Sequence, residues 1–529
     1  MGKSILFLWA TVLTVALLTF QASAAGGGGR GPKLSSGRDE AAALQNESVG
    51  GPFTSLCTSA TTFGSNVQTN CDSTVLPHNE TAIAADPANP AHLVGGTNDT
   101  ELPPNGASGS AKSALGYYTS FDGGATWLNG QVPDGTFTQT SDASVVFDTA
   151  GRVDIGAVAF DLGRGGLALG GAIQVSTSTD GGRIFAAPSV VERSTSPTIF
   201  EDKPYLAADD SAASPFAGSV YVTWTRFHFA DKKETQFLES PIFFSASRDG
   251  GKTWSPPKEI SGVNPAVCTF SGTSLPNDGS CREDQFSSPV VGADGTIYVG
   301  FENDQAVNDG QFRNQYLVVK SSDGGATWSA PVRASDVLSD GASDYPINVQ
   351  GRQTLSNSQF RVNSAGNLAI DPTTGALFVT WSDNRNGTAS STNTDVFVAG
   401  SADGGATWSA PVAVSSAAND QFYPWAAVAP DGTLEVVYFD RSYDAANSKY
   451  GVTLAKLGGS AQRVDTGLSD PNNARWFSVS GETAFLGDYN GLAIGSDGVA
   501  HPFWTDMRRV VTVNHATGTT EDAFTAAVH

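Results

Sequence analysis

Residues 120–127 read SFDGGATW, and four further stretches repeat this spelling: STDGGRIF at 178–185, SRDGGKTW at 247–254, SSDGGATW at 321–328 and SADGGATW at 401–408. Their acidic residues are 58 to 80 residues apart and are Asp122, Asp180, Asp249, Asp323 and Asp403. This spacing suits a small four-stranded sheet with its loops. A repeat on that scale is typical of solenoids, propellers and other arrays.

The repeated stretch has the chemistry of a tight turn between two strands. Asp-Gly-Gly supplies a side-chain acceptor and two residues that tolerate positive φ, and the Trp opens the next strand as a large apolar anchor. The pattern S-x-D-x-G-x-T-W resembles the Asp box, or bacterial neuraminidase repeat, of the sialidase superfamily. The resemblance implies that the five Asp residues are structural. The copy at 178–185 has Ile184 for Thr and Phe185 for Trp, which predicts a differently anchored blade.

Each box belongs to a longer repeat of four strands. The region 202–254 shows it best, with segments rich in β-branched and aromatic residues at 202–209, 218–226 and 241–247 before the final Trp. Similar repeats begin near residues 80, 142, 202, 285, 367, 421 and 486. The sequence therefore predicts an all-β propeller of seven four-stranded blades. Six blades, the number that the sialidase resemblance implies, is the alternative.

The last repeat stops after three strands. We expect the N-terminal segment 66–72 to supply the fourth strand and so to close the ring. Closure of this kind hides sheet edges that would otherwise pair with other chains.

The N-terminus predicts export. Lys3 gives a positive charge, residues 5–20 are apolar, and Ala22-Ser23-Ala24 forms a cleavage site. We expect a signal peptide at 1–24, a flexible leader at 25–51 and a single propeller domain at 52–529. No stable membrane anchor would remain after cleavage, and the protein would be secreted, extracellular or periplasmic.

Four cysteines fall into two short-range pairs, Cys57 with Cys71 and Cys268 with Cys281. In an exported protein this spacing predicts two disulfides. Metal ligation is the weaker alternative, because neither pair has C-x-x-C spacing and no His cluster accompanies them.

The net charge is −23, from 53 acidic and 30 basic residues. Such a surface argues against nucleic acid and anionic membranes as partners. No cofactor is expected, although the many Asp-containing turns are compatible with a structural Ca²⁺. We expect a monomer.

In a propeller, a ligand site lies at one mouth of the channel, where the first strand of each blade begins. Acidic residues gather at these starts: Glu80, Asp142, Asp202, Asp420 and Asp488. Glycosidases use two carboxyl groups about 5–5.5 Å or about 6.5–9.5 Å apart, and crowding raises the pKa of one of them. These residues are the predicted catalytic set. Tyr489 with Glu80 is a candidate nucleophile and base, and a packed core tyrosine is the alternative.

Arginines follow the second strand of several blades. Arg385, Arg441 and Arg508 each follow an Asp at matching positions, and Arg226 ends a second strand earlier in the chain. Because guanidinium groups bind carboxylates bidentately, these four are predicted to bind an anionic sugar, with Tyr423 stacking on its ring. The alternative is that the Asp–Arg pairs are salt bridges between loops.

The sialidase resemblance implies three arginines on a substrate carboxylate, an Asp acid/base and a Tyr nucleophile activated by Glu. The family's Phe/Tyr-Arg-Ile-Pro motif is missing, and Phe360-Arg-Val-Asn363 matches it only in part. We therefore predict a secreted carbohydrate-acting propeller, a hydrolase of an anionic glycan or glycoconjugate. The alternatives are a uronate polysaccharide lyase and a non-catalytic binding or scaffold propeller.

Overall fold

The structure is a computed structural model. It describes residues 56–59, 61–71, 76–101, 112–162, 168–232, 236–269, 275–303, 315–336, 354–358, 360–388, 390–475, 485–513 and 515–529. The predicted signal peptide and leader lie outside these residues, so both stay predictions.

Seven small antiparallel sheets form the molecule, and each is one blade. Blade 1 consists of β4 (His78–Asp86), β5 (Asn89–Glu101), β6 (Lys112–Ser120) and β7 (Trp127–Gln131), and blade 2 consists of β8 (Gln139–Phe147), β9 (Val153–Leu162), β10 (Ala168–Ser178) and β11 (Ser189–Arg193). Blade 3 consists of β12 (Ile199–Ala208), β13 (Val220–Phe229), β15 (Ile242–Ser247) and β16 (Lys258–Glu259), with β14 (Phe237–Glu239) beside β13. Blade 4 consists of β17 (Asp284–Val291), β18 (Ile297–Asn303), β19 (Gln315–Ser321) and β20 (Val332–Asp336).

The remaining blades are blade 5, β21 (Ala365–Ile370), β22 (Leu377–Asp383), β23 (Asp395–Ser401) and β24 (Val412–Ala413); blade 6, β25 (Gln421–Val428), β26 (Leu434–Asp440), β27 (Gly451–Lys456) and β28 (Ala461–Arg463); and blade 7, β29 (Gly491–Ile494), β30 (Ala500–Asp506), β33 (Asp522–Thr525) and β3 (Asn66–Gln68). A short 3-10 helix, η2, spans Pro471–Asn473.

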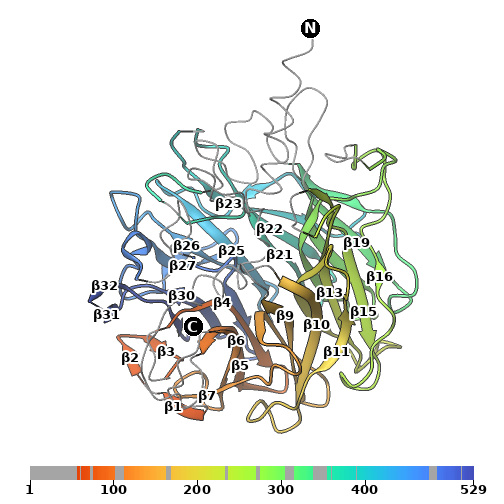
Figure 1. The fold of residues 1–529 in the computed structure, drawn as a ribbon. Helices are drawn as coiled ribbons and strands as arrows, with labels where there is room; N and C mark the ends of the chain where they lie inside the picture. Colours follow the sequence, from red (N-terminus) through yellow and green to blue (C-terminus); the bar gives the residue numbers. More distant parts are fainter. Residues whose placement is uncertain are drawn as a thin grey trace.

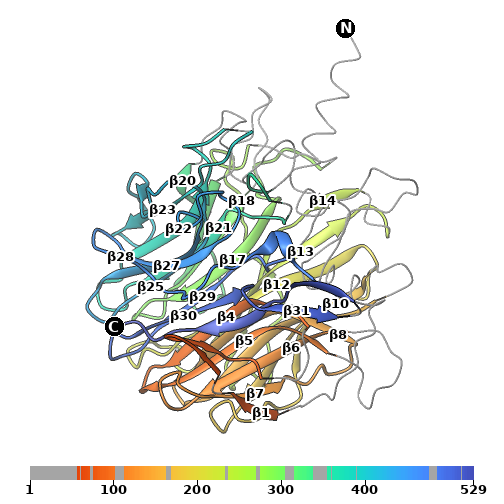
Figure 2. The ribbon, with the colours of Figure 1, turned by 90° about the vertical axis from the view of Figure 1, so that its left-hand side faces the viewer.

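The first strands of the blades form a closed inner ring. Each packs against the first strand of the next blade, in the order β4, β8, β12, β17, β21, β25, β29 and back to β4. The views in Figure 1 and Figure 2 agree, with the blue C-terminal strand β30 beside the orange β4. The seven-bladed propeller is therefore confirmed, and the six-bladed alternative is wrong.

An N-terminal strand closes the ring, as predicted. β3 pairs antiparallel with β33, with Val67 opposite Thr525. The buried Asn66 Nδ2 donates to Val464 O at 2.9 Å, which ties this strand to blade 6 as well. Three additions were not predicted: β1 (Leu56–Ser59) as a fifth strand on β7, β2 (Thr61–Phe63) on β3, and a hairpin of β31 (Val510–Val513) and β32 (Ala516–Thr519).

The repeated turns are held by their Asp carboxylates. Asp323 accepts hydrogen bonds from Thr327 N at 2.8 Å and from Thr327 Oγ1 at 2.6 Å. These bonds lower the pKa of Asp323 to about 2. The second copy is anchored differently, since Ile184 is exposed and Phe185 packs against Tyr117 at 4.8 Å between ring centroids.

The core lies between neighbouring blades and is rich in aromatic residues. Four tryptophans from four blades are almost fully buried: Trp127, Trp224, Trp381 and Trp504. The predicted disulfide between Cys268 and Cys281 is present, with Cα atoms 5.2 Å apart. The side chain of Cys57 lies outside the described residues, so its bond to Cys71 stays a prediction.

Two features are absent from the described ranges. No helix in them is long and apolar enough to cross a membrane. They also hold no group of three or more His, Cys, Asp or Glu side chains arranged to bind a metal ion.

Candidate active site

Six of the seven inner strands break their register at the same point near their start. The breaks fall between Asn79 and Ala82, Ser141 and Ser144, Asp202 and Tyr205, Gln285 and Ser288, Ala365 and Leu368, and Phe422 and Trp425. Five of these bulges carry a non-glycine residue at positive φ: Glu80, Asp142, Lys203, Phe286 and Tyr423. Bulges of this kind re-aim side chains, so the ring of bulges presents a ring of side chains at one end of the channel.

These bulges store strain. A non-glycine residue in the left-handed region costs about 1 to 3 kcal/mol and persists only where the surroundings enforce it. Lys203 is the extreme case, since φ is 49° and the next residue is a proline, which further restricts the residue before it. Strain repeated around one end of a channel points to a functional site there.

Two carboxyl groups of this ring interact directly. Asp142 and Asp202 are both buried, and they lie close enough for a hydrogen bond between their side chains. Burial first, and then the nearby charge of Asp142, hold the pKa of Asp202 well above its ordinary value. Because a carboxylate cannot donate, such a bond requires that one of the two groups is protonated.

A buried ion pair crosses from the segment before blade 5 to the start of blade 7. Arg361 binds both oxygens of Asp488, with Nε 3.0 Å from Oδ1 and one terminal nitrogen bonded to Oδ2. The Tyr423 hydroxyl donates to Arg361 O at 2.9 Å, and Asn363 Nδ2 donates to Asp488 O at 2.8 Å. Asp488 is thereby held in place beside Asp142 and Asp202.

Lys203 and Tyr489 complete the cluster. The Lys203 ammonium lies over the Tyr489 ring, 3.4 Å from its centroid. Burial lowers the pKa of Lys203 to about 8, although Asp142, Glu80 and Asp488 oppose this shift. Burial, followed by the charge of Glu80, raises the pKa of Tyr489. Glu80 itself accepts a hydrogen bond from Asn98 Nδ2 at 2.9 Å.

Of the predicted catalytic residues, Glu80, Asp142, Asp202, Asp488 and Tyr489 interact as one cluster. Asp420 does not take part in these interactions. It accepts bonds from Thr394 N at 3.1 Å and Asn447 Nδ2 at 2.8 Å, and it pairs with Arg441 at 3.5 Å. Asp420 therefore belongs to a network that joins the loops of blades 5 and 6.

Arg441 is fully enclosed in that same network. It donates to Ser356 O at 2.9 Å and Asn447 O at 3.0 Å, and its exposed fraction is 0%. Burial lowers its pKa to about 10. An arginine with no exposed surface that pairs with Asp420 fits the alternative of a salt bridge between loops, and its role in binding substrate stays a prediction.

Arg385 and Arg508 each bind an Asp carboxylate that also accepts a hydrogen bond from a Trp of the same blade. Trp381 Nε1 donates to Asp383 Oδ2 at 2.9 Å and Arg385 Nε donates to Asp383 Oδ1 at 2.8 Å. Blade 7 repeats this geometry with Trp504, Asp506 and Arg508, at 3.0 and 2.8 Å.

Blade 3 uses Glu201 as the carboxylate, which accepts from Trp224 at 2.6 Å and Arg226 at 2.7 Å. Thus Arg226, Arg385 and Arg508 each bind a carboxylate of their own blade. The Asp–Arg pairs of blades 5 and 7 are therefore salt bridges, but each lies within one loop and does not join two loops. The role of these arginines in binding substrate stays a prediction.

The sequence did not lead us to select Lys203 or Arg361 as site residues. Their signal was positional, because Lys203 follows Asp202 at a bulge and Arg361 lies in the segment that resembles the missing arginine motif in part. Their partners, Tyr489 and Asp488, are far away in sequence.

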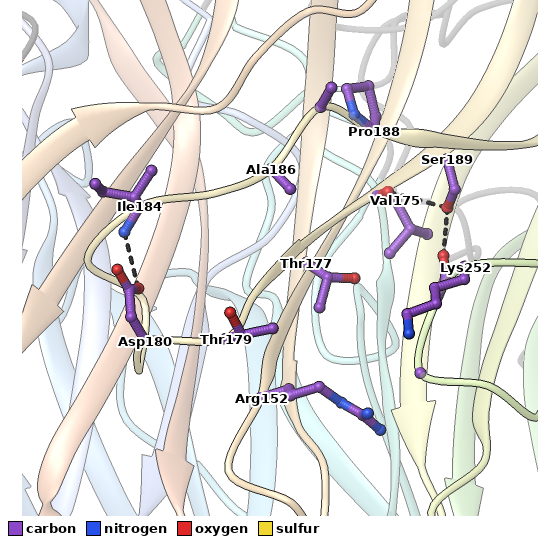
Figure 3. Close-up of a pocket in the computed structure, with 13 residues that line it drawn as sticks. Arg152, Val175, Thr177, Thr179, Asp180, Ile184, Ala186, Pro188, Ser189 and Lys252 are labelled. Atoms are coloured by element: carbon purple, nitrogen blue, oxygen red, sulfur yellow. Dashed lines mark hydrogen bonds between the residues drawn. The ribbon is translucent and has the colours of Figure 1, made fainter.

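A wide cleft lies elsewhere, at the turns between the third and fourth strands. It has a volume of about 680 Å³ and is lined by residues of blades 2 and 3, including Arg152, Asp180, Ile184 and Lys252 (Figure 3). Because strands alternate in direction, these turns lie at the end of the blades opposite the bulge ring. Ser189 Oγ donates to Gly251 O of blade 3 at 2.6 Å. Val175 O, on the neighbouring strand of blade 2, lies 3.2 Å from the same hydroxyl oxygen.

No protein family model and no curated protein matches this chain. Among solved structures, a protein of unknown function from Dyadobacter fermentans is 14% identical, with a TM-score of 0.43, covering 73% of this chain and 94% of that one. A Hadza microbial sialidase is 12% identical (TM-score 0.41; 89% and 95% covered). A GH93 α-L-arabinofuranosidase of Fusarium graminearum, solved with arabinobiose, is 14% identical (TM-score 0.41; 74% and 96% covered). Similarity at this level does not identify the functional site. The assignment of the fold rests on the seven sheets described above.

Proposed function

We propose that this protein is a glycoside hydrolase that acts at the ring of bulges. The observation that carries the proposal is the buried contact between the Asp142 and Asp202 carboxyl groups. The raised pKa of Asp202 favours retention of a proton, which a general acid requires near neutral pH. The Asp-box resemblance of the sequence supports the same class of reaction.

The two hydrogen-bonded carboxyl groups would act as one acid. Directly bonded groups are closer than the roughly 5–5.5 Å needed to flank a glycosidic bond. The second catalytic group would be Tyr489, with Glu80 as the base that takes its proton on attack, because Glu80 is the charged group that most affects the pKa of Tyr489. Asp488, held by Arg361, would stabilise the positive charge that develops on the sugar.

A second candidate is the narrower one from the sequence, a hydrolase of an anionic glycan. The observation in its favour is the buried ammonium group of Lys203, which has no hydrogen-bond partner among the described residues. Its predicted binding residues Arg385, Arg441 and Arg508 already bind other groups of the protein.

The test is release of sugar from a panel of neutral, sialylated and uronate-containing glycans. We expect wild type to release product from some of them, and Asp142→Asn and Asp202→Asn to lower the rate by about 10²–10⁴-fold. Asp395→Asn is the matched control, since Asp395 is a buried carboxyl group with a pKa raised by burial in blade 5. Its activity should be retained. Product from Asp202→Asn at the wild-type rate, or none from any folded protein, would contradict the proposal, and the latter would favour a binding or scaffold propeller.

We also propose that the chain is exported and that residues 1–24 are removed. The Cys268–Cys281 disulfide supports an oxidising compartment. N-terminal sequencing of protein from the culture medium or periplasm tests this. A mature protein that begins at Met1 would contradict it.

A further inference from the structure

Lys203 is a buried ammonium group without a hydrogen-bond partner among the described residues. Only 8% of the residue is exposed. Its Nζ lies 3.4 Å from the centroid of the Tyr489 ring and 4.9 Å from that of Tyr205. The two rings supply cation–π attraction, but they leave the three N–H donors without an acceptor oxygen.

An ammonium group in this position lacks hydrogen-bond acceptors. Burying a polar group without a hydrogen bond is unfavourable, and for a charge the penalty is larger. The strained backbone at Lys203 holds the side chain in this position. The buried ammonium group and the strained backbone both raise the free energy of the folded state. This points to a ligand that supplies a hydrogen-bond acceptor to Lys203.

A small cavity adjoins Lys203. Its lining comes from blades 3 to 7 and includes Tyr205, Ser288, Gly366, Trp425 and Asp488. The space suits one group of about the size of a water molecule. The Tyr205 and Trp425 rings pack against each other with centroids 5.2 Å apart, so part of the wall of this cavity is aromatic.

The charges around the cavity decide which acceptor fits. Glu80 and Asp488 are acidic, and the Asp142–Asp202 pair carries one more negative charge when it holds one proton. Lys203 and Arg361 supply two positive charges, so the cluster is net negative by one charge. Arg361 is already bound bidentately to Asp488. A carboxylate would therefore add repulsion and would find no free guanidinium group, whereas a hydroxyl group would meet neither obstacle.

We propose that the cavity beside Lys203 is a subsite for a hydroxyl group of an uncharged sugar, which accepts a hydrogen bond from the Lys203 ammonium. This inference rests on the proposed glycoside hydrolase function and names its substrate class. It makes Lys203 a specificity-determining residue. It also excludes the anionic glycan given above as the second candidate.

Binding can be measured without turnover, so that failure of this subsite and failure of the hydrolase proposal are distinguishable. The probes are methyl glycosides in matched pairs that differ only in CH₂OH against COO⁻, namely glucoside with glucuronide and galactoside with galacturonide, together with the methyl pentosides of arabinose and xylose. Calorimetry with wild type should show at least one neutral glycoside bound, and any acidic counterpart bound at least 10-fold more weakly. Lys203→Met should weaken the neutral ligand at least 10-fold. Lys203→Gln, which keeps a donor, should lose less.

Thermal melting first establishes that each variant is folded. Tighter binding of an acidic sugar than of its neutral partner would overturn the proposal. So would neutral binding that Lys203→Met leaves unchanged, or the absence of binding by every probe at millimolar concentration. Binding with the expected preference but without hydrolysis of any glycan would uphold the subsite and reject the hydrolase.

Discussion

Arg361→Met should destabilise the propeller strongly, because Arg361 and Asp488 join two blades that are not neighbours in the ring. Both side chains are buried, with exposed fractions of 6% and 8%. Removing one partner of a buried ion pair leaves the other charge uncompensated and costs about 3–5 kcal/mol. That is a large part of the roughly 5–15 kcal/mol by which a domain is stable.

The loss should depend on pH with a defined sign. Arg361 at present lowers the pKa of Asp202. Without it, the neighbouring carboxyl groups bind protons more readily in the folded state, so the variant should recover stability relative to wild type as the pH falls. Urea unfolding at pH 7 and pH 5 measures both the loss and its recovery.

A double-mutant cycle separates the pair from its surroundings. Arg361→Met with Asp488→Leu replaces both charges by apolar groups, which is often close to neutral, so the double variant should be more stable than Arg361→Met alone by about 2 kcal/mol or more. The exposed pair Lys449–Asp470 is the control, with exposed fractions of 45% and 25%, and should contribute about 1 kcal/mol at most. A loss below about 1 kcal/mol for Arg361→Met, or additive effects in the cycle, would refute the reasoning.

Three further predictions concern stability. Asp202→Asn should stabilise the fold at pH 7, because the wild-type protein loses stability as the pH rises through the raised pKa of Asp202. The gain in stability should vanish in acid, and a variant less stable than wild type at pH 7 would contradict this prediction. Burial lowers the pKa of His501 to about 4, so about 3 kcal/mol of stability should be lost as the pH falls from 6.5 to 4. Unfolding curves of the His501→Gln variant should lack this loss, whereas those of His515→Gln, a change at an exposed histidine, should still show it. Replacing Cys268 and Cys281 by Ser should lower the free energy of unfolding by about 3 kcal/mol, as expected for a sequence separation of 13, and a loss near zero in denaturant titration would show that the loop is already constrained.

The blades could be predicted because their signal is local and repeated. Each Asp-Gly-Gly turn contains its own acceptor, donors and positive-φ residues, as the bonds from Thr327 to Asp323 show. The closing strand at Asn66–Gln68 was also predictable, because a ring with three strands in its last blade leaves an unpaired edge. β1 carries no comparable signal, since a fifth strand at an outer edge completes no repeat.

The site was predictable only in part. Asp142, Asp202 and Asp488 were recognised by their position at the start of a repeat, but position alone also selected Asp420, which belongs to a network of loops. The arginines repeat because Trp381 and Trp504 each need a carboxylate, which in turn binds an arginine. That repetition serves the blade.

The partners in the cluster could not be paired from the sequence. Arg361 is 127 residues from Asp488, and Lys203 lies on a different blade from Tyr489. Only the closed ring brings these side chains together. The register breaks depend on how neighbouring blades pack, so no local sequence pattern predicts them.

We infer that Asp142 and Asp202 share a proton, and infrared difference spectroscopy at pH 7 can detect it. A protonated carboxyl group has a C=O stretch distinct from that of a carboxylate. We expect such a band in wild type, its loss in both Asp142→Asn and Asp202→Asn, and no change in Asp323→Asn, whose carboxyl group has a lowered pKa. A wild-type spectrum without this band, or a band that survives in both variants, would show that the two carboxyl groups do not share a proton.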